Sequence, residues 1–278
     1  ANNNSYDTYG NRVSRCGDDA IEVDHVVANA RTWRNVATNS RMGVTNQPLF
    51  GGPAYTFRNE IFYLQDGVLP VREGSAFKLH NGASGSVLIH NTASKDSYGV
   101  VTSMFQNSFF RNNIFLGGTR ALSMWGSGTI TGLPPSPNVA DWDYNSYRAG
   151  AGQVVVRFYD TNYTSVPALY LGKGVEAHGL ATEYSHLVQA VPPAVFQAPG
   201  VELTDFDFQL VPGAPQINAG DVLANINEPF VVDGMPDIGA LEAGQPRPIY
   251  GPRPVGDADR DHALGASDLS AVRAVLGQ

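Results

Sequence analysis

The first half of the chain alternates apolar and polar residues in short runs, and similar runs recur at a nearly constant interval. A tetrad with an aromatic or aliphatic residue two places before an Asn occurs five times. The tetrads are Thr8-Tyr9-Gly10-Asn11, Thr32-Trp33-Arg34-Asn35, Thr56-Phe57-Arg58-Asn59, Leu88-Ile89-His90-Asn91 and Phe109-Phe110-Arg111-Asn112. Their Asn residues are 24, 24, 32 and 21 positions apart, which indicates one solenoid coil per repeat and a long insertion around residues 62–74.

A second set of runs lies between the tetrads and keeps step with them. These runs begin at Ala20, Gly43, Ala76, Gly99 and Ala121, with spacings of 23, 33, 23 and 22 residues. Because both sets share the insertion, the sequence predicts a parallel β-helix. The alternative is a β-sandwich, whose strands would alternate without placing an Asn at a fixed point of each period.

Strand alternation assigns the faces of the tetrads. If each Asn points inward and hydrogen-bonds to its neighbours from coil to coil, the residue two before it also points inward. We therefore expect a core column of Tyr9, Trp33, Phe57, Ile89 and Phe110. The residue just before each Asn then points outward, which gives a column of Gly10, Arg34, Arg58, His90 and Arg111.

The outward basic column suggests a polyanionic ligand such as a polyuronate, which Arg34, Arg58, His90 and Arg111 would bind. The alternative is that these arginines stack on neighbouring rungs and pair with acidic loop residues.

The second set of runs places acidic and basic residues on one outward face. Glu22 and Asp24, with Asp18 and Asp19 at the preceding turn, gather four carboxylates, and such a cluster favours a bound calcium ion. Lys78 and His80 lie two rungs away, at about 9.6 Å from the inter-strand spacing, and are candidate catalytic bases. Alternatively, Asp18 and Asp19 cap a turn and Lys78 pairs with Glu22 or Asp24.

Composition supports the all-β prediction and narrows the function. Charged residues make up 16% of the chain and there are 30 glycines, a balance that suits short strands and turns. The net charge of −8 argues against a general nucleic-acid binder, and no apolar stretch is long enough to span a membrane. His25, His178 and His186 are isolated in the sequence, and no His pair has zinc-ligand spacing, so a zinc enzyme is not expected.

Several stretches resemble secreted right-handed β-helix proteins related to pectate and alginate lyases. They are Gly17–Asp24, Gln47–Pro53, Asp141–Asn145, Phe208–Pro215 and Pro236–Glu242. The resemblance implies a right-handed solenoid and a secreted or cell-surface protein, and it likens the Glu22 and Asp24 pair to the calcium-binding acidic pair of alginate- and chondroitin-type lyases. That group also includes hydrolases, epimerases and proteins of no known activity. Its members usually have several coils before the Gly-Asp-Asp stretch, so we expect an N-terminally shortened piece.

The C-terminal region differs in composition from the repeats. Residues 243–256 carry four prolines and read as a linker between a β-helix of residues 1–242 and a module of residues 257–278. Asp257, Asp259, Asp261 and Asp268 occupy positions 1, 3, 5 and 12 of an EF-hand-like calcium loop, and a helix is expected over 269–276. This module resembles half of a dockerin, which implies a cohesin-like partner. His262 replaces the usual Gly and a second loop is missing, so a solvated acidic tail is the alternative.

Two functional hypotheses follow. In the first, the chain is an extracellular, calcium-assisted polysaccharide lyase with Lys78 or His80 as the base, the acidic group as the metal site and the basic column as the acidic-sugar site. In the second, it is a non-catalytic glycan-binding or scaffold protein that associates end to end through open strand edges.

Overall fold

Short β-strands dominate the structure, which is a computed structural model. It describes residues 4–24, 28–47, 52–64, 74–79, 83–95, 101–103, 105–124, 140–159, 161–194, 197, 201–227, 230–231, 233–251, 266–267 and 270. His80 and the predicted calcium ligands Asp257, Asp259, Asp261 and Asp268 lie outside the described residues.

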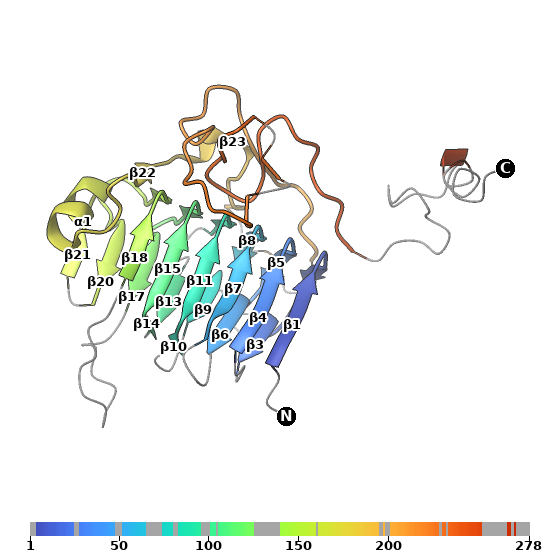
Figure 1. Ribbon diagram of the computed structural model, residues 1–278, viewed down its shortest axis with the longest axis horizontal. Helices are drawn as coiled ribbons and strands as arrows, with labels where there is room; N and C mark the ends of the chain where they lie inside the picture. The colour runs from blue at the N-terminus through green and yellow to red at the C-terminus, as the bar shows by residue number, and fades with distance from the viewer. Residues whose placement is uncertain are drawn as a thin grey trace.

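Consecutive strands pass through three parallel sheets in turn (Figure 1). The first sheet contains β1 (Asn4–Tyr9), β4 (Ala28–Trp33), β7 (Ala54–Phe57), β11 (Ser86–Ile89), β15 (Ser108–Arg111) and β18 (Ala140–Asp143). The second contains β2 (Arg12–Ser14), β5 (Val36–Ser40), β8 (Glu60–Leu64), β12 (Thr92–Ser94), β16 (Ile114–Leu116), β19 (Ser146–Arg148) and β22 (Leu180–Ala181). The third contains β3 (Asp19–Asp24), β6 (Met42–Gln47), β9 (Phe77–Leu79), β13 (Val101–Ser103), β17 (Leu122–Met124), β20 (Val156–Phe158) and β21 (Thr161–Tyr163), of which β21 alone pairs antiparallel among these described strands.

The smaller elements complete the chain. β10 (Ala83–Ser84) pairs with β14 (Phe105–Gln106), and β23 (Leu187–Gln189) pairs with β24 (Asp207–Leu210). The 3-10 helix η1 (Tyr184–His186) precedes β23. The helix α1 (Val166–Lys173) begins where the Ser165 hydroxyl accepts the Ala168 N–H and ends at Gly174, whose φ is 72°.

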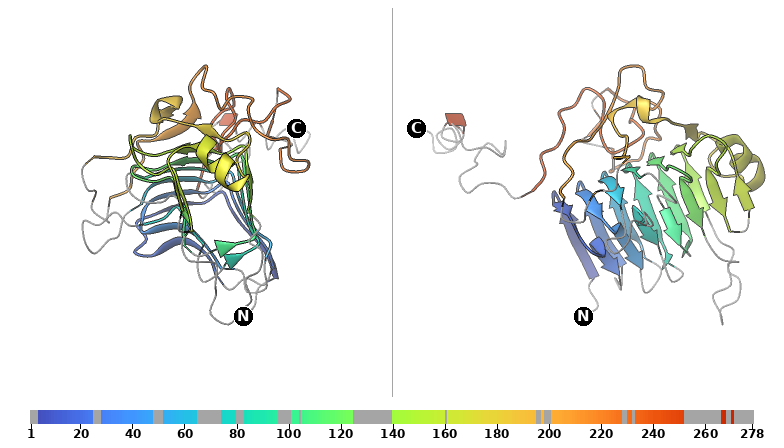
Figure 2. Two further views of the ribbon diagram at one scale, coloured as in Figure 1. Left: turned by 90° about the vertical axis from the view of Figure 1, so that its left-hand side faces the viewer. Right: turned by 180° about the vertical axis from the view of Figure 1, so that it is seen from behind.

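The registers follow the sequence period. Tyr9 is opposite Trp33, and Trp33 is opposite Phe57, while Thr45 is opposite Lys78 across the insertion. The all-β class and the parallel pairing are confirmed, and the stack of strands seen in Figure 2 is compatible with a β-helix. One predicted run is shifted, because Val101 is opposite Phe77 and the run from Gly99 had placed Val100 there.

A backbone bend after each first-sheet strand reverses the predicted faces of the aromatic column. The residue before each ladder Asn has a positive φ, for example 49° at Arg34 and 52° at Arg58, so strict alternation does not carry through it. Tyr9, Trp33 and Phe57 therefore stack outside the coils, with ring centres 4.6 and 5.6 Å apart, and the core prediction was wrong for them.

The interior at this level is formed by the preceding register. Thr32, Thr56 and Leu88 are each no more than 2% exposed. Phe110, which shares their register, is fully buried as predicted and stacks on Trp142 with ring centres 5.0 Å apart.

An asparagine ladder runs along the bend between the first and second sheets. Each Asn side chain donates from Nδ2 to the Oδ1 atom of the next coil's Asn, at 2.8–3.0 Å. The ladder residues are Asn11, Asn35, Asn59, Asn91, Asn113 and Asn145. The fifth rung is Asn113 rather than the predicted Asn112, because two asparagines are consecutive there and the bend, with φ 58°, falls on Asn112.

Two cores hold the molecule together. The inner core lies between the sheets, and α1 closes it at the end away from β1, where Val166 and Leu169 are buried (Figure 1). A second core forms where Phe206, Phe208 and Ile238 pack against the outer face of the second sheet. The outer face of the second sheet is thus covered.

The first part of the predicted linker also contacts the coils. Arg247 pairs with the buried Glu60 of β8 at 2.8 Å, and the Tyr250 hydroxyl donates to the same carboxylate. Among the described residues, no helix has the length and apolar character needed to cross a membrane.

Candidate functional site

Three of the four predicted acidic residues come together on β3. One carboxylate oxygen from each of Asp19, Glu22 and Asp24 lies within 4.8 Å of the others. Asp18 is outside this cluster and lies 3.6 Å from Arg41. Calcium binds oxygen ligands at about 2.3–2.6 Å, so oxygens within 4.8 Å of one another can contact a single ion. The three oxygens are of the chemical kind that calcium takes and would supply part of its roughly six to eight ligands.

Lys78 lies two strands from this acidic cluster, as predicted. Glu22 is opposite Thr45, which is opposite Lys78, and the Lys78 ammonium reaches back to Asp19 at 3.0 Å. The pairing predicted as the alternative was with Glu22 or Asp24, whereas the observed partner is Asp19. Both side chains are largely buried, so the ion pair neutralises Asp19 and competes with a cation for it.

The negative charge of the acidic cluster also acts on a neighbouring tyrosine, Tyr6. Burial raises the pKa of Tyr6 on β1, and the negative charges of Asp24 and Glu22 raise it further. The Tyr6 hydroxyl therefore stays neutral beside the carboxylates, and the surroundings favour a positively charged ligand.

The predicted basic column is mostly occupied by contacts within the chain. Arg58 is 3% exposed, pairs with Glu242 at 2.7 Å and lies 4.4 Å from the centre of the Phe230 ring. Arg34 is a partly exposed residue, and its guanidinium lies 5.5 Å from the centre of the same ring. Arg58 thus anchors the C-terminal segment rather than facing solvent.

His90 is fully buried next to that segment. Its Nδ1 lies 3.2 Å from the Gly239 carbonyl oxygen, and its Nε2 lies about 3 Å from the amide nitrogens of Asn112 and Asn227. Burial, and then the charge of Arg58, holds the pKa of His90 well below 6.5. The ring is therefore neutral and provides no positive charge for an anionic ligand.

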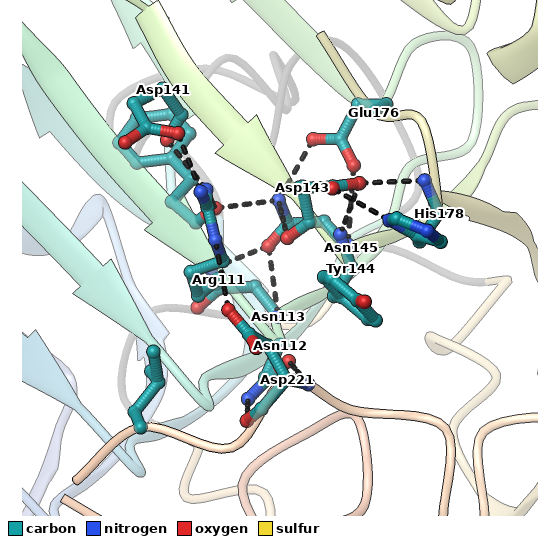
Figure 3. Close-up of polar contacts among 12 residues, drawn as sticks. Arg111, Asn112, Asn113, Asp141, Asp143, Tyr144, Asn145, Glu176, His178 and Asp221 are labelled. Atoms are coloured by element: carbon teal, nitrogen blue, oxygen red, sulfur yellow. Dashed lines mark hydrogen bonds and ion pairs between the residues drawn. The ribbon is translucent and has the colours of Figure 1, made fainter.

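Arg111 lies at the end of β15, one residue before the bend, and so is not part of the basic column. Its guanidinium contacts Asp141 at 2.5 Å and Asp221 at 3.4 Å (Figure 3). It also lies over the Phe109 ring. The single positive charge of Arg111 is therefore outnumbered by these two carboxylates.

Sequence reasoning missed an Asp–His pair one coil further on. Asp143 ends β18, opposite Arg111, and its Oδ2 lies 2.8 Å from the Nδ1 atom of His178 (Figure 3). Its Oδ1 accepts the backbone N–H groups of His178 and Tyr144, and the Tyr144 ring stacks on the imidazole. A carboxylate thus holds the Nδ1 atom of the imidazole, while 59% of the His178 side chain is exposed.

A signal for this pair was present in the sequence. Asn145 follows Asn113 by 32 residues, the same interval that separates Asn59 from Asn91. Extending the ladder in this way would have placed Asp143 beside Arg111, although the position of His178 depends on a loop with no repeat.

The fold and the site define a class: an all-β chain of parallel sheets with a carboxylate cluster beside a lysine on one outer face. Neither a protein-family model nor a curated protein sequence matches this chain. The function is therefore argued from the geometry of the site.

Proposed function

We propose that this chain is a secreted or cell-surface protein with a right-handed β-helix fold that acts on an acidic polysaccharide as a calcium-assisted lyase. The observation that carries the proposal is the cluster of Asp19, Glu22 and Asp24 oxygens within 4.8 Å, with the Lys78 ammonium 3.0 Å from Asp19. The cluster supports a cation, and Lys78 supports proton transfer beside it.

The geometry of the third sheet suits an extended sugar chain. Neighbouring strands are about 4.8 Å apart, so β3 and β9, two strands apart, are separated by about 9.6 Å. One or two sugar units span that distance. A polysaccharide crossing the strands would contact both the acidic cluster and Lys78.

The reaction is β-elimination. A base takes the proton alpha to the uronate carboxyl, a double bond forms, and the bond to the leaving sugar oxygen breaks, so that this oxygen departs with a proton. Calcium held by Asp19, Glu22 and Asp24 would neutralise the uronate carboxylate, which acidifies the alpha proton. Lys78 can accept this proton only after it stops donating to Asp19 and loses its own extra proton. If Asp19 turned to a bound cation, the Lys78 ammonium would lose this partner, and its extra proton would then have to pass to solvent before Lys78 could act as the base.

The test is incubation with alginate, pectate and chondroitin, followed by the ultraviolet absorbance of the unsaturated product, with calcium and with a chelator. We expect product only with calcium, a loss of at least about 100-fold in Lys78→Ala, and a comparable loss in Glu22→Gln. Lys173→Ala changes an exposed lysine of α1 and serves as the control. His80→Ala tests the second predicted base, and full activity in Lys78→Ala would refute the assignment of Lys78.

A non-catalytic scaffold is the second candidate, and one observation favours it. Within the described strands, β1, β2 and β3 each stand at the end of their sheet and leave an unpaired hydrogen-bonding edge. Ordered end-to-end fibres in negative-stain images, without cleavage of any polymer, would support this function. The predicted half-dockerin, with its cohesin-like partner, remains a proposal for residues 257–278 and is tested by calcium titration of the full chain.

A further inference from the structure

A cavity of about 240 Å³ lies where the C-terminal segment crosses the bend of the N-terminal coils. Arg34 and Arg58 provide its wall on the coil side. Glu242, Pro246, Pro248 and Tyr250 are among the residues that line it from the C-terminal segment, and Phe230 lies beside both arginines. Chain segments about 200 residues apart in sequence therefore build this cavity together.

The charges in the cavity do not cancel. Glu242 pairs with Arg58 at 2.7 Å. Among the described residues no carboxylate pairs with Arg34, whose guanidinium lies 5.5 Å from the centre of the Phe230 ring. Among the lining residues, two arginines and one glutamate leave a net charge of +1, which a monoanion would balance.

A buried donor in the same cavity wall also lacks a partner. Arg58 uses Nη1 on the Ala240 carbonyl oxygen and Nη2 on Glu242. Its Nε atom is buried and has no hydrogen-bond partner among the described residues. A buried N–H without an acceptor is costly, at about 1–3 kcal/mol. Because this atom is buried and both Nη atoms of Arg58 are engaged, the arginine that offers donors to a ligand in the cavity is Arg34.

The remaining walls are apolar. Phe230, Leu241, Pro246 and Pro248 offer ring and aliphatic surfaces beside the guanidinium groups. The volume is below the range of about 300–1,000 Å³ typical of drug-sized ligands. A ligand must therefore combine one negative charge with a body about the size of one ring.

We propose that this cavity binds a single uronic acid ring, with the carboxylate on Arg34 and the ring against Phe230 and the two prolines. The planar fork of Arg34 suits a carboxylate bidentately. The choice of an acidic sugar rests on the proposed function, but the cavity is separate from the acidic cluster of β3. The ring is either a free monosaccharide or the end of a chain.

Isothermal titration calorimetry of the full chain tests this proposal with galacturonate, glucuronate, the corresponding trisaccharides, glucose and acetate. We expect a uronate to bind and glucose not to bind, with acetate weaker than the uronate. Arg34→Ala should weaken uronate binding at least about tenfold, the usual effect of losing a charged hydrogen bond. Arg31→Ala, which removes an exposed arginine of β4 paired with Asp7, is the matched control. Tighter binding of the trisaccharide than of the monosaccharide identifies a chain end as the ligand.

Three results would overturn the proposal. The first is no uronate binding by the unaltered chain, and the second is an affinity of Arg34→Ala equal to that of the unaltered chain. The third is binding of acetate as tight as that of the uronate, which would show that the sugar ring is not recognised. Glu22→Gln separates this proposal from the lyase. Uronate binding that persists when Glu22→Gln abolishes cleavage supports two independent sites, and cleavage without uronate binding rejects the cavity alone.

Discussion

Glu176 ends the asparagine ladder and should make the stability of the fold depend on pH. Its Oε1 accepts from Asn145 Nδ2 at 2.8 Å and from the Tyr147 hydroxyl at 2.6 Å, and its Oε2 accepts the Asn145 N–H at 3.2 Å. The side chain is 2% exposed. Burial raises the pKa of Glu176 from 4.5 to about 7, although the hydrogen bonds from Tyr147 and Asn145 oppose that shift.

The sign and size of the effect follow from this raised pKa. Between pH 4.5 and about 7 the folded chain holds a proton at Glu176 that the unfolded chain has lost, so stability falls as the pH rises through this window. A shift of about 2.5 units, at about 1.36 kcal/mol per unit, corresponds to about 3 kcal/mol between the two ends of the window.

Glu176→Gln removes the titration and keeps the shape. The Gln carbonyl can accept from Asn145 Nδ2 and Tyr147, but its amide faces the Asn145 N–H, which we expect to cost about 1 kcal/mol at low pH. As the pH rises, ionisation of the buried Glu176 destabilises the native chain, whereas a Gln at this position does not ionise. Between pH 4.5 and 8, the free energy of unfolding of Glu176→Gln should therefore rise by about 3 kcal/mol relative to that of the native chain.

Urea unfolding at half-unit steps from pH 4.5 to 8 measures this difference. Glu183→Gln is the control, because Glu183 is an exposed glutamate paired with Arg148. Other buried carboxyls with raised pKa, such as Glu60, titrate in both proteins and cancel in the comparison. Parallel stability curves for the native chain and Glu176→Gln would refute the reasoning.

Two further predictions concern buried polar contacts, and both are measured by urea unfolding at pH 7. Asn91→Ala removes a central rung and leaves the Asn59 donors without their acceptor, so it should cost about 3 kcal/mol, whereas Asn11→Ala at the exposed end should cost under about 1 kcal/mol. If Asn91→Ala and Asn11→Ala lowered the free energy of unfolding equally, the stabilisation would not come from the side-chain hydrogen bonds between rungs. Arg58→Ala strands the buried Glu242 and should cost about 3–5 kcal/mol, and the double variant Arg58→Met with Glu242→Leu should recover most of it. A double variant no more stable than Arg58→Ala would show that the ion pair is not the cause.

The repeat in the sequence predicted the strands and their pairing, but not which side of the coil each residue faces. The registers came from counting, and Trp33 opposite Phe57 confirms that step. The predicted inward and outward faces depended on side chains continuing to alternate through the residue before each Asn. A positive φ at Arg34 and Arg58 ends that alternation, and nothing in a single sequence marks a left-handed Arg.

The acidic cluster could be predicted from the sequence, but the surroundings of the basic column could not. Asp19, Glu22 and Asp24 lie within one strand, and Lys78 follows from the period, so their meeting was predictable. The covering of Arg58 and His90 was not, because it depends on Asn227 and residues 239–242 returning to the bend without any repeat to place them. The repeating pattern thus predicts contacts within a coil and between neighbouring coils. It does not predict where a distant segment without repeats packs against them.

The direction of the ladder explains why an acidic residue stands at its far end. Every Asn donates toward the next coil and accepts from the previous one, so the series needs an acceptor that has nothing further to donate. A carboxylate meets that condition, and Glu176 accepts from Asn145 as each ladder Asn accepts from the one before it. Its own φ is 63°, whereas in the preceding coils the positive φ falls on the residue before the ladder Asn. At the other end, Asn11 Oδ1 has no donor among the described residues. A coil that stacks before β1 must therefore bring an N–H donor to that point, and a ladder Asn would supply it.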